Sequence, residues 1–243
     1  MKKDQIKAIQ RALIAEGYPL PKYGVDGYVG SEFYHALGQW AYKNNHLPQG
    51  KQEEVKSTMT TKFKHSKRSQ PIKKVVLHWT AGLGDAAQVE RTLVARKYGI
   101  HYVVDPKGVV TQLAPHDVVV SHCGGANEDS IGIEIVGMGQ ATSPRQMKSL
   151  KWGVNFRTTS VVFLGKKRNI YVMPLVQLDA VASLVSEICK EEGIPKVMPP
   201  DVRMSKDAIA SFSGVMGHYH AHATKLDPGP LVMSYVRESW NAT

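Results

Sequence analysis

The spacing of hydrophobic residues changes several times along the chain, and each spacing predicts a different kind of element. Residues 174–191 repeat apolar side chains every three or four positions, which predicts an amphipathic helix. Residues 3–16 and 86–97 carry the same helical spacing, and 229–240 is expected to close as a last helix. In 86–97, the side chains expected to face inward are Val89, Leu93 and Val94.

Shorter apolar runs predict strands. "VVLH" is a β-branched run that ends at His78, "SIGIEIVG" covers 130–137, and "SGVMGH" gives a last short strand. Residues 100–115 place apolar runs on both sides of Asp105-Pro106-Lys107-Gly108, which predicts a hairpin. Because strands and helices mix along one stretch, the predicted fold is α/β, with a central mixed sheet flanked by helices.

The chain divides into three parts. Residues 1–47 predict a small helical domain, in which two helices flank a turn-rich loop containing Asp26, Gly27 and Gly30. Residues 48–71 are polar and basic and are interpreted as a linker. A nucleic-acid-binding tail would interleave aromatic residues, and 46–70 contains only Phe63. Residues 72–243 form the main domain.

Residues 141–173 stand apart from this main pattern. "TTSVVFLGKKRNIYV" predicts an extra hairpin with Lys166-Lys167-Arg168 at its turn. A solvated basic turn is the favoured interpretation, and a basic lip over a binding cleft is the alternative.

Composition narrows the choice of partner. The formal net charge of +10 favours a polyanion, such as nucleic acid, an anionic lipid surface or an anionic cell-wall polymer. No nucleic-acid recognition motif is visible, so no nucleic-acid partner is expected. The two cysteines make no disulfide framework, and Cys189 fits a buried apolar position in the 174–191 helix. No apolar run is long enough for a membrane span, and Asp4, Gln5 and Lys7 interrupt any signal peptide.

Three residues could share a metal ion. His78 and His218 each end a predicted strand, and Asp227 follows nine positions after His218. Zinc takes neutral imidazole nitrogen and carboxylate oxygen, and catalytic zinc sites keep one position open. Spacing alone leaves the alternative that each histidine is only a hydrogen-bonded residue at a strand end.

Five motifs occur in a recognisable order: "VVLHWTAG", "IHYVVDPKGVVTQLAP", "SHCGG", "NEDSIGIEIVG" and "GHYHAHATKLDPGP". Together, over about residues 72–240, they resemble the zinc-dependent N-acetylmuramoyl-L-alanine amidase family, whose fold is shared with peptidoglycan recognition proteins. At the N-terminus, "YGVDGYVGSEFYHAL" resembles the repeat core of the peptidoglycan-binding domain family. That resemblance implies wall binding through the loop with Asp26, Gly27 and Gly30, whereas the alternative is a purely structural helical hairpin.

The amidase resemblance implies a role for each matching residue. His78, His218 and Asp227 match the zinc ligands of the family. Glu134 in "SIGIEIVG" matches its catalytic glutamate, and Lys225 matches the lysine placed beside the substrate carbonyl. The alternatives are an exposed strand glutamate and a surface lysine.

Other residues near these motifs are expected to do different work. The residues expected to contact substrate are Trp79, Thr80 and His122. His220 and His222 are expected to be loop residues, or at most to support a ligand, because four ligands would fill the open position. The chain departs from the family pattern at Ile100, where some members have tyrosine, and at Cys123, which is not at a ligand position.

The resemblance implies hydrolysis of the amide bond between the lactyl group of N-acetylmuramic acid and L-alanine, with Zn²⁺ as cofactor. Peptidoglycan is the expected partner, together with an anionic wall or outer-membrane surface, and a monomer is expected. A small binding domain, a linker and an amidase without a signal peptide resemble a bacteriophage endolysin, which stays in the host cytoplasm until release and then acts on the wall. The alternative is a non-catalytic peptidoglycan recognition protein on the same fold.

Overall fold

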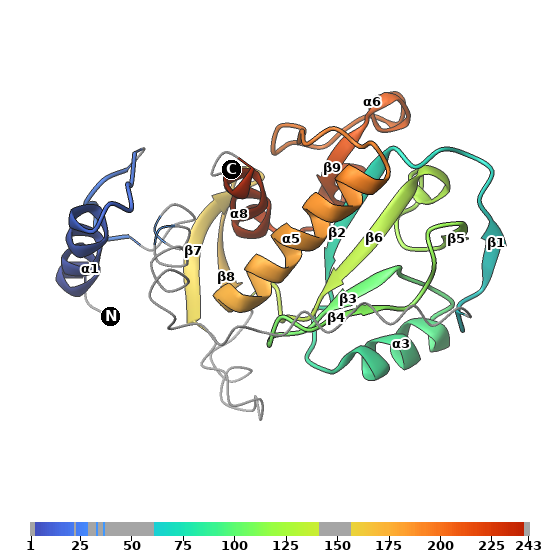
Figure 1. The fold of residues 1–243 in the computed structure, drawn as a ribbon, viewed down its shortest axis with the longest axis horizontal. Helices are drawn as coiled ribbons and strands as arrows, with labels where there is room; N and C mark the ends of the chain where they lie inside the picture. The colour runs from blue at the N-terminus through green and yellow to red at the C-terminus, as the bar shows by residue number, and fades with distance from the viewer. Residues whose placement is uncertain are drawn as a thin grey trace.

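The computed structural model describes residues 3–21, 23–28, 33, 36, 61–140 and 157–240. Its centre is a five-stranded sheet with the order β4-β3-β6-β2-β9 (Figure 1). The strands are β2 (Lys74–Trp79), β3 (Tyr102–Val104), β4 (Val110–Gln112), β6 (Ser130–Ile135) and β9 (Gly214–Gly217). Strands β3, β6, β2 and β9 run parallel, and β4 pairs antiparallel with β3, so the mixed α/β sheet predicted from the sequence is confirmed.

Helices cover both faces of this sheet. Helices α5 (Leu175–Glu191) and α8 (Pro230–Ser239) lie on one face, where Val75, Leu77 and Ile133 join their buried side chains in the main hydrophobic core (Figure 1). Helix α3 (Ala86–Ala95) packs Val89 into a second cluster that holds Ile100 and Val103. The expectation that Val94 faces inward is wrong, because its side chain is 40% exposed.

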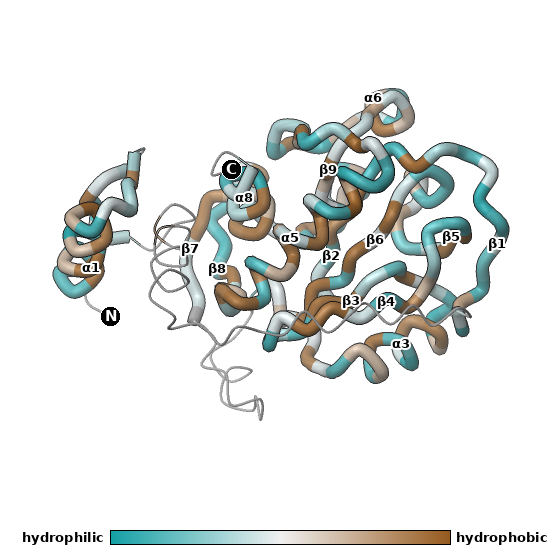
Figure 2. The backbone as a smooth tube through the Cα atoms, viewed as in Figure 1, coloured by the Kyte–Doolittle hydropathy of each residue, from teal (hydrophilic) through white to brown (hydrophobic). Residues whose placement is uncertain are grey.

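Hydrophobic residues lie along the strands that the helices cover. Figure 2 shows hydrophobic residues along β6, the strand that lies between β3 and β2. Helix α5 is also fixed by a polar contact, because the buried Gln177 amide donates to the backbone oxygens of Val104 (3.0 Å) and Val136 (2.8 Å). These bonds hold α5 against the carboxyl ends of β3 and β6, next to the strand ends that carry the site.

Both predicted hairpins are present. β3 and β4 form the first, and β7 (Arg157–Phe163) pairs antiparallel with β8 (Lys166–Val172) to form the second. The turn of the second consists of Leu164 and Gly165, whose φ angles are 49° and 72°. The prediction that Lys166-Lys167-Arg168 make the turn is therefore wrong, because these residues begin β8 and are paired with β7.

The predicted linker is too long at its C-terminal end. Strand β1 (His65–Lys67) pairs antiparallel with β5 (Val118–Val120), and Phe63 is only 3% exposed in the cluster around α3. Arg68 donates to the backbone oxygens of His116 (2.7 Å) and Glu128 (2.7 Å). The residues from 61 onward thus belong to the main domain, and residues 48–60 lie outside the described part of the chain.

The N-terminal segment contains helix α1 (Lys3–Ala15), which buries Leu13 together with Tyr18 and Leu20. The Gln10 amide donates to Asp26 Oδ1 (2.7 Å), and its oxygen accepts from Gly27 N (2.8 Å), so α1 holds the turn-rich loop. Gly30 and most of the second predicted helix lie outside the described residues.

The remaining short helices are η1 (Asn127–Asp129), α6 (Lys206–Ser211) and α7 (His218–Ala221). Across the described ranges, no helix combines the length and apolar character needed to cross a bilayer. Cys123 and Cys189 are both free and buried, and Cys189 packs in the main core as expected.

Candidate functional site

The chemistry-bearing residues gather where three neighbouring parallel strands end. His78 lies near the end of β2, Glu134 near the end of β6, and His218 directly after β9. β2 is the central strand of the three, and His78 is in register with Glu134. Residues in register on adjacent strands point to the same face, which here is the face opposite α5. In open α/β sheets, the carboxyl ends of the strands are the usual place for a ligand.

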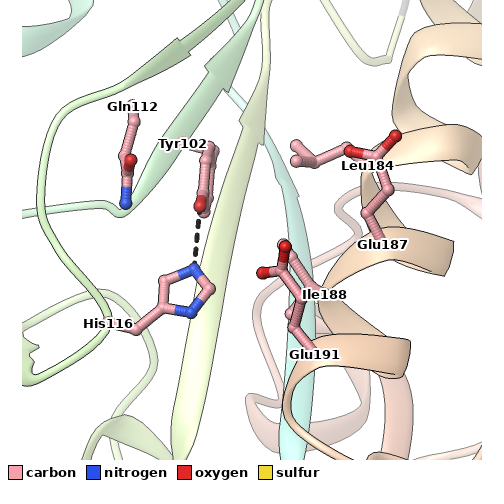
Figure 3. Close-up of a pocket in the computed structure, with 7 residues that line it drawn as sticks. All are labelled: Tyr102, Gln112, His116, Leu184, Glu187, Ile188 and Glu191. Atoms are coloured by element: carbon pink, nitrogen blue, oxygen red, sulfur yellow. Dashed lines mark hydrogen bonds between the residues drawn. The ribbon is translucent and has the colours of Figure 1, made fainter. Parts of the chain in front are cut away.

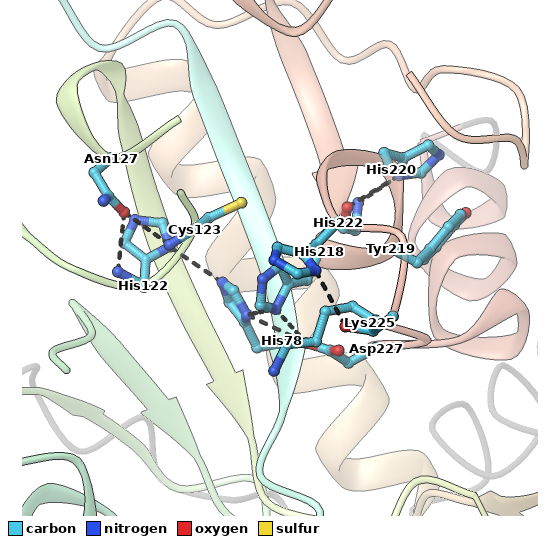
Figure 4. Close-up of polar contacts among 12 residues, drawn as sticks. His78, His122, Cys123, Asn127, His218, Tyr219, His220, His222, Lys225 and Asp227 are labelled. Atoms are coloured by element: carbon cyan, nitrogen blue, oxygen red, sulfur yellow. Dashed lines mark hydrogen bonds and ion pairs between the residues drawn. The ribbon is translucent and has the colours of Figure 1, made fainter. Parts of the chain in front are cut away.

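Three donor atoms form a tight triangle at this place (Figure 4). His78 Nδ1 lies 3.0 Å from His218 Nδ1 and 3.3 Å from Asp227 Oδ2. The third side, between His218 Nδ1 and Asp227 Oδ2, is 2.9 Å. All three side chains are buried, so few waters compete for these atoms. The structure therefore brings together the three residues that the sequence analysis grouped, in an arrangement that could hold one small cation.

The electrostatics of this triangle favour a cation. Burial lowers the pKa of His78 to about 4, so its imidazole is neutral near pH 7. Burial alone would raise the pKa of Asp227, but its contacts with His218 and His78 outweigh burial and hold that pKa well below the usual range. The site thus presents a neutral imidazole and an ionised carboxylate, in the protonation states that metal ligands require.

Glu134 and Lys225 flank the triangle. Burial raises the pKa of Glu134 to about 8, with the charge of Asp227 adding to the shift and the charge of Lys225 opposing it. Lys225 is exposed, and Figure 4 shows it beside Asp227. Two ionisable groups therefore lie beside the three donors. Glu134 is partly accessible and can hold a proton near neutral pH, and Lys225 provides an ammonium group.

The loop between His218 and Asp227 returns to the strand end through close packing. A Cβ atom at Gly217 would lie 2.7 Å from Pro228 Cδ, so only glycine allows residues 227 and 228 to approach β9 this closely. The loop also closes on itself, because Tyr219 N donates to Asp227 O at 3.0 Å. This packing explains why two donors nine residues apart share one point.

His122 supports the site in a way that the sequence analysis did not predict. The Ser130 hydroxyl donates to Ala126 O (2.5 Å), so it accepts from His122 Nε2–H (3.2 Å). Burial holds the pKa of His122 well below its usual value, so its ring is neutral and Nδ1 carries no proton. His122 Nδ1 then accepts from His78 Nε2–H at 3.1 Å, which leaves His78 Nδ1 as a lone pair directed at the other two donors.

Both nitrogens of His122 are thus engaged inside the protein, and neither is available to hydrogen-bond a substrate. A contact with substrate through the ring carbon edge stays a prediction. Ser130 was missed because it carries no motif of its own and precedes Glu134 in an otherwise apolar strand.

The other two residues expected to contact substrate, Trp79 and Thr80, have contacts within the protein, and their contact with substrate stays a prediction. Trp79 follows His78 on the strand, so it points to the opposite face and packs against the main core. A Cβ atom at Gly139 would lie 2.3 Å from the Trp79 ring, and a Cβ atom at Gly229 would lie 2.9 Å from it. The Thr80 hydroxyl donates to Gly82 O (2.7 Å) and accepts from Gly137 N (3.0 Å), so it joins two chain segments.

His220, His222 and Cys123 lie in the same sequence motifs as residues of the site, but none of them is part of the donor triangle. His220 is fully buried and bridges Gly217 N (3.0 Å) and Pro200 O (3.1 Å), which makes it a structural support. His222 is exposed and contacts Thr224 Oγ1 at 3.2 Å. Burial raises the pKa of the Cys123 thiol to about 12, so it stays protonated and is a poor ligand.

A cavity lies on the face of the sheet that α5 covers. This cavity of about 300 Å³ is bordered by Tyr102 and His116 on one side and by Glu187 and Glu191 of α5 on the other (Figure 3). Tyr102 Oη lies 2.8 Å from His116 Nε2, and His116 Nδ1 lies 2.5 Å from Glu192 Oε1. This hydrogen-bonded chain joins β3 to the end of α5, and the sheet separates it from the donor triangle.

Comparison with known proteins identifies the class to which this fold and site belong. The family model described as N-acetylmuramoyl-L-alanine amidase matches residues 68–230, which is more than half of the chain. The chain therefore belongs to the N-acetylmuramoyl-L-alanine amidase family. No curated protein matches it.

Several solved structures are similar to the chain. N-acetylmuramoyl-L-alanine amidase LysC from Clostridium intestinale URNW is 14% identical with a TM-score of 0.49, covering 75% of this chain and 93% of that one. The Ph2119 endolysin from a Thermus scotoductus MAT2119 bacteriophage is 19% identical with a TM-score of 0.44, covering 72% and 88%. AmiD from E. coli, solved with anhydro-N-acetylmuramic acid-L-Ala-D-gamma-Glu-L-Lys, is 24% identical with a TM-score of 0.44, covering 68% and 56%.

Proposed function

We propose that the protein is a zinc-dependent hydrolase that cuts peptidoglycan between the lactyl group of N-acetylmuramic acid and the L-alanine of the stem peptide. The observation that carries this proposal is the buried triangle of His78 Nδ1, His218 Nδ1 and Asp227 Oδ2 with Glu134 in register beside it. Family membership supplies the bond and the substrate class.

The three donors fit zinc by chemistry and by spacing. A tetrahedral zinc ion with bonds of about 2.0–2.1 Å holds its ligands about 3.3 Å apart, and the three donor separations here are 2.9, 3.0 and 3.3 Å. Two imidazoles and one carboxylate form a ligand set known from catalytic zinc sites, with a fourth position left for water or substrate. A bound Zn²⁺ supplies Lewis acidity, which polarises an amide carbonyl and acidifies a water molecule at the site.

Glu134 is proposed to move the proton. Its carboxylate takes a proton from the water that attacks the carbonyl carbon, and it delivers that proton to the nitrogen of L-alanine as the C–N bond breaks. Water is consumed, and a carboxylic acid and a free amine result. Burial raises the pKa of Glu134 to about 8, so the carboxylate that takes the proton is the minor form at pH 7 and is a strong proton acceptor for a carboxylate.

Lys225 is proposed to stabilise negative charge on the carbonyl oxygen. Its charge lies close enough to oppose the rise in the pKa of Glu134 and to help lower that of His78. An ammonium group placed where negative charge develops in the transition state stabilises that charge electrostatically.

The domain arrangement supports a more specific proposal, that of a modular bacteriophage endolysin. The N-terminal segment, with Asp26 and Gly27 held on α1, is proposed to bind the wall, and the net charge of +10 favours an anionic wall or outer-membrane surface. The enzyme is proposed to wait in the host cytoplasm and to act on the wall after release.

The decisive experiment is digestion of purified peptidoglycan with and without a chelator, with products identified by mass spectrometry. Free stem peptides that begin at L-alanine, lost on chelation and restored by Zn²⁺, are the expected result. Intact glycopeptide with the protein still bound would refute the hydrolase and favour a recognition protein. Release of products cut at any other bond would refute the proposed bond.

A further inference from the structure

The segment from His218 to Asp227 consists of α7 and the loop that follows it, and it carries two of the three donor atoms as well as Lys225. Residues 222–225 of this loop belong to no helix or strand. Backbone carbonyls in such a segment have no helix or sheet partner, so they bond to water or to groups elsewhere in the protein. The protein groups that bond to them come mostly from one short segment, residues 200–204.

Arg203 provides most of these contacts. Its Nη1 donates to the backbone oxygens of Tyr219 and His222, the latter at 2.5 Å. Its Nη2 donates to the backbone oxygens of Ala223 and Lys225, both at 2.8 Å. One guanidinium group therefore binds four carbonyls that fall within seven consecutive residues, and the last of them belongs to Lys225 itself.

The residues next to Arg203 contact the same loop. Met204 N donates to His220 O at 2.9 Å, and the His220 ring contacts Pro200 O at 3.1 Å. The Tyr219 hydroxyl donates to Asp201 Oδ1 at 2.5 Å. Segment 200–204 therefore supports the loop, and none of these hydrogen bonds uses a donor atom of the triangle.

The geometry of a guanidinium group explains why arginine suits this position. Its planar fork offers five N–H donors in fixed directions, so it can bind several carbonyls at once. A lysine ammonium offers three donors on a flexible stem and cannot reproduce this arrangement. Arg203 is partly buried, and so is its contact with the backbone oxygen of Tyr219.

We propose that Arg203 is a positioning residue that sets the place of Lys225 and Asp227 by holding the backbone between His218 and Asp227. The inference rests on the proposed function, because it takes Asp227 as a zinc ligand and Lys225 as a group that contacts substrate. Displacements of about 1 Å are enough to reduce catalysis strongly. Loss of the Arg203 hydrogen bonds therefore weakens both metal binding and turnover, although every metal ligand is still present.

The test compares the full chain with Arg203→Met and Arg203→Lys, and with Arg91→Met as a control that removes a positive charge from the exposed surface of α3. Three quantities are measured: the zinc Kd by chelator competition, backbone amide exchange of residues 219–227 without metal, and kcat and KM on soluble muropeptide. Arg203→Met should weaken zinc binding about 10- to 100-fold, the range seen when residues that support ligands are removed. Its loop amides should exchange faster, and kcat should fall more than KM rises.

Arg203→Lys keeps the charge and should recover only a minor part of each loss, while Arg91→Met should match the wild type. An unchanged zinc Kd and unchanged loop exchange in folded Arg203→Met would overturn the proposal, as would full recovery in Arg203→Lys. If the wild type binds zinc but cuts no peptidoglycan, the proposed function fails and the zinc Kd still decides the role of Arg203. If the wild type binds no zinc, the amide exchange decides whether Arg203 holds the loop.

Discussion

Replacing His122 by alanine tests how the site prepares His78 for a metal. In the wild type, His122 Nδ1 accepts a hydrogen bond from His78 Nε2–H at 3.1 Å, so His78 Nδ1 carries no proton and can bind a cation. Without His122, the metal-free protein can move the His78 proton to Nδ1, where it faces Asp227 Oδ2 at 3.3 Å. The metal-bound protein has no such choice, because Nδ1 must then bind the ion.

The cost of the substitution therefore falls on the metal-bound state. It leaves the His78 Nε2–H group buried without an acceptor, at about 1–3 kcal/mol. Since about 1.4 kcal/mol corresponds to a factor of ten in an equilibrium constant, the zinc Kd should rise about 10- to 100-fold. His122→Asn is the matched control, because its amide oxygen can replace Nδ1 as the acceptor and should limit the loss.

The assay is competition with a chromophoric chelator, run on folded protein as judged by circular dichroism. A zinc Kd for His122→Ala within about twofold of the wild-type value would refute the role assigned to the His122–Ser130 pair. A loss in His122→Asn as large as that in His122→Ala would show that the acceptor is not the relevant feature. That outcome would favour packing of the ring instead.

Three further predictions concern other parts of the chain. Glu134→Gln should keep zinc binding but lose turnover by about 10²- to 10⁴-fold, measured as release of stem peptides, and full activity would remove Glu134 from the mechanism. Burial lowers the pKa of His101 to about 3, so the folded state binds fewer protons than the unfolded state below about pH 6.5. The contribution of His101 to the free energy of unfolding therefore decreases as the pH is lowered, by about 2 kcal/mol between pH 7 and pH 5. In urea unfolding, the stability of His101→Gln should depend less on pH than that of the wild type. Deleting residues 1–47 should weaken sedimentation with purified walls but preserve cleavage of soluble muropeptides; unchanged sedimentation would argue against a wall-binding domain.

The regular elements were accessible from the sequence because their patterns are long or specific. Helix α5 follows the period of 174–191 to within a residue, and the β3–β4 hairpin follows from the turn residues between its apolar runs. The group of His78, His218 and Asp227 was found by combining strand ends with motif order, and the structure brings these residues together. Their role as metal ligands stays a prediction.

The features that the sequence analysis missed have identifiable physical causes. The alternation of a strand places Trp79 on the face opposite His78, where it packs against the main core. Strand β1 was missed because all three of its residues are exposed and show no alternation, so only Phe63 hinted at a packed segment. Arg203 had no signal at all, because it lies in an irregular segment and binds only backbone carbonyls.

The distance along the chain between the donors has a consequence for how folding and metal binding depend on each other. His78 and His218 are 140 positions apart, and strands β2 and β9 must pair before their rings meet. An unfolded chain offers no comparable chelating site, so an ion that binds here stabilises only the assembled sheet. At a free concentration one hundred times the Kd, this linkage is worth about 2.7 kcal/mol, so chelation should lower the melting temperature of the whole domain. Metal content would then report on the integrity of the fold from β2 to β9.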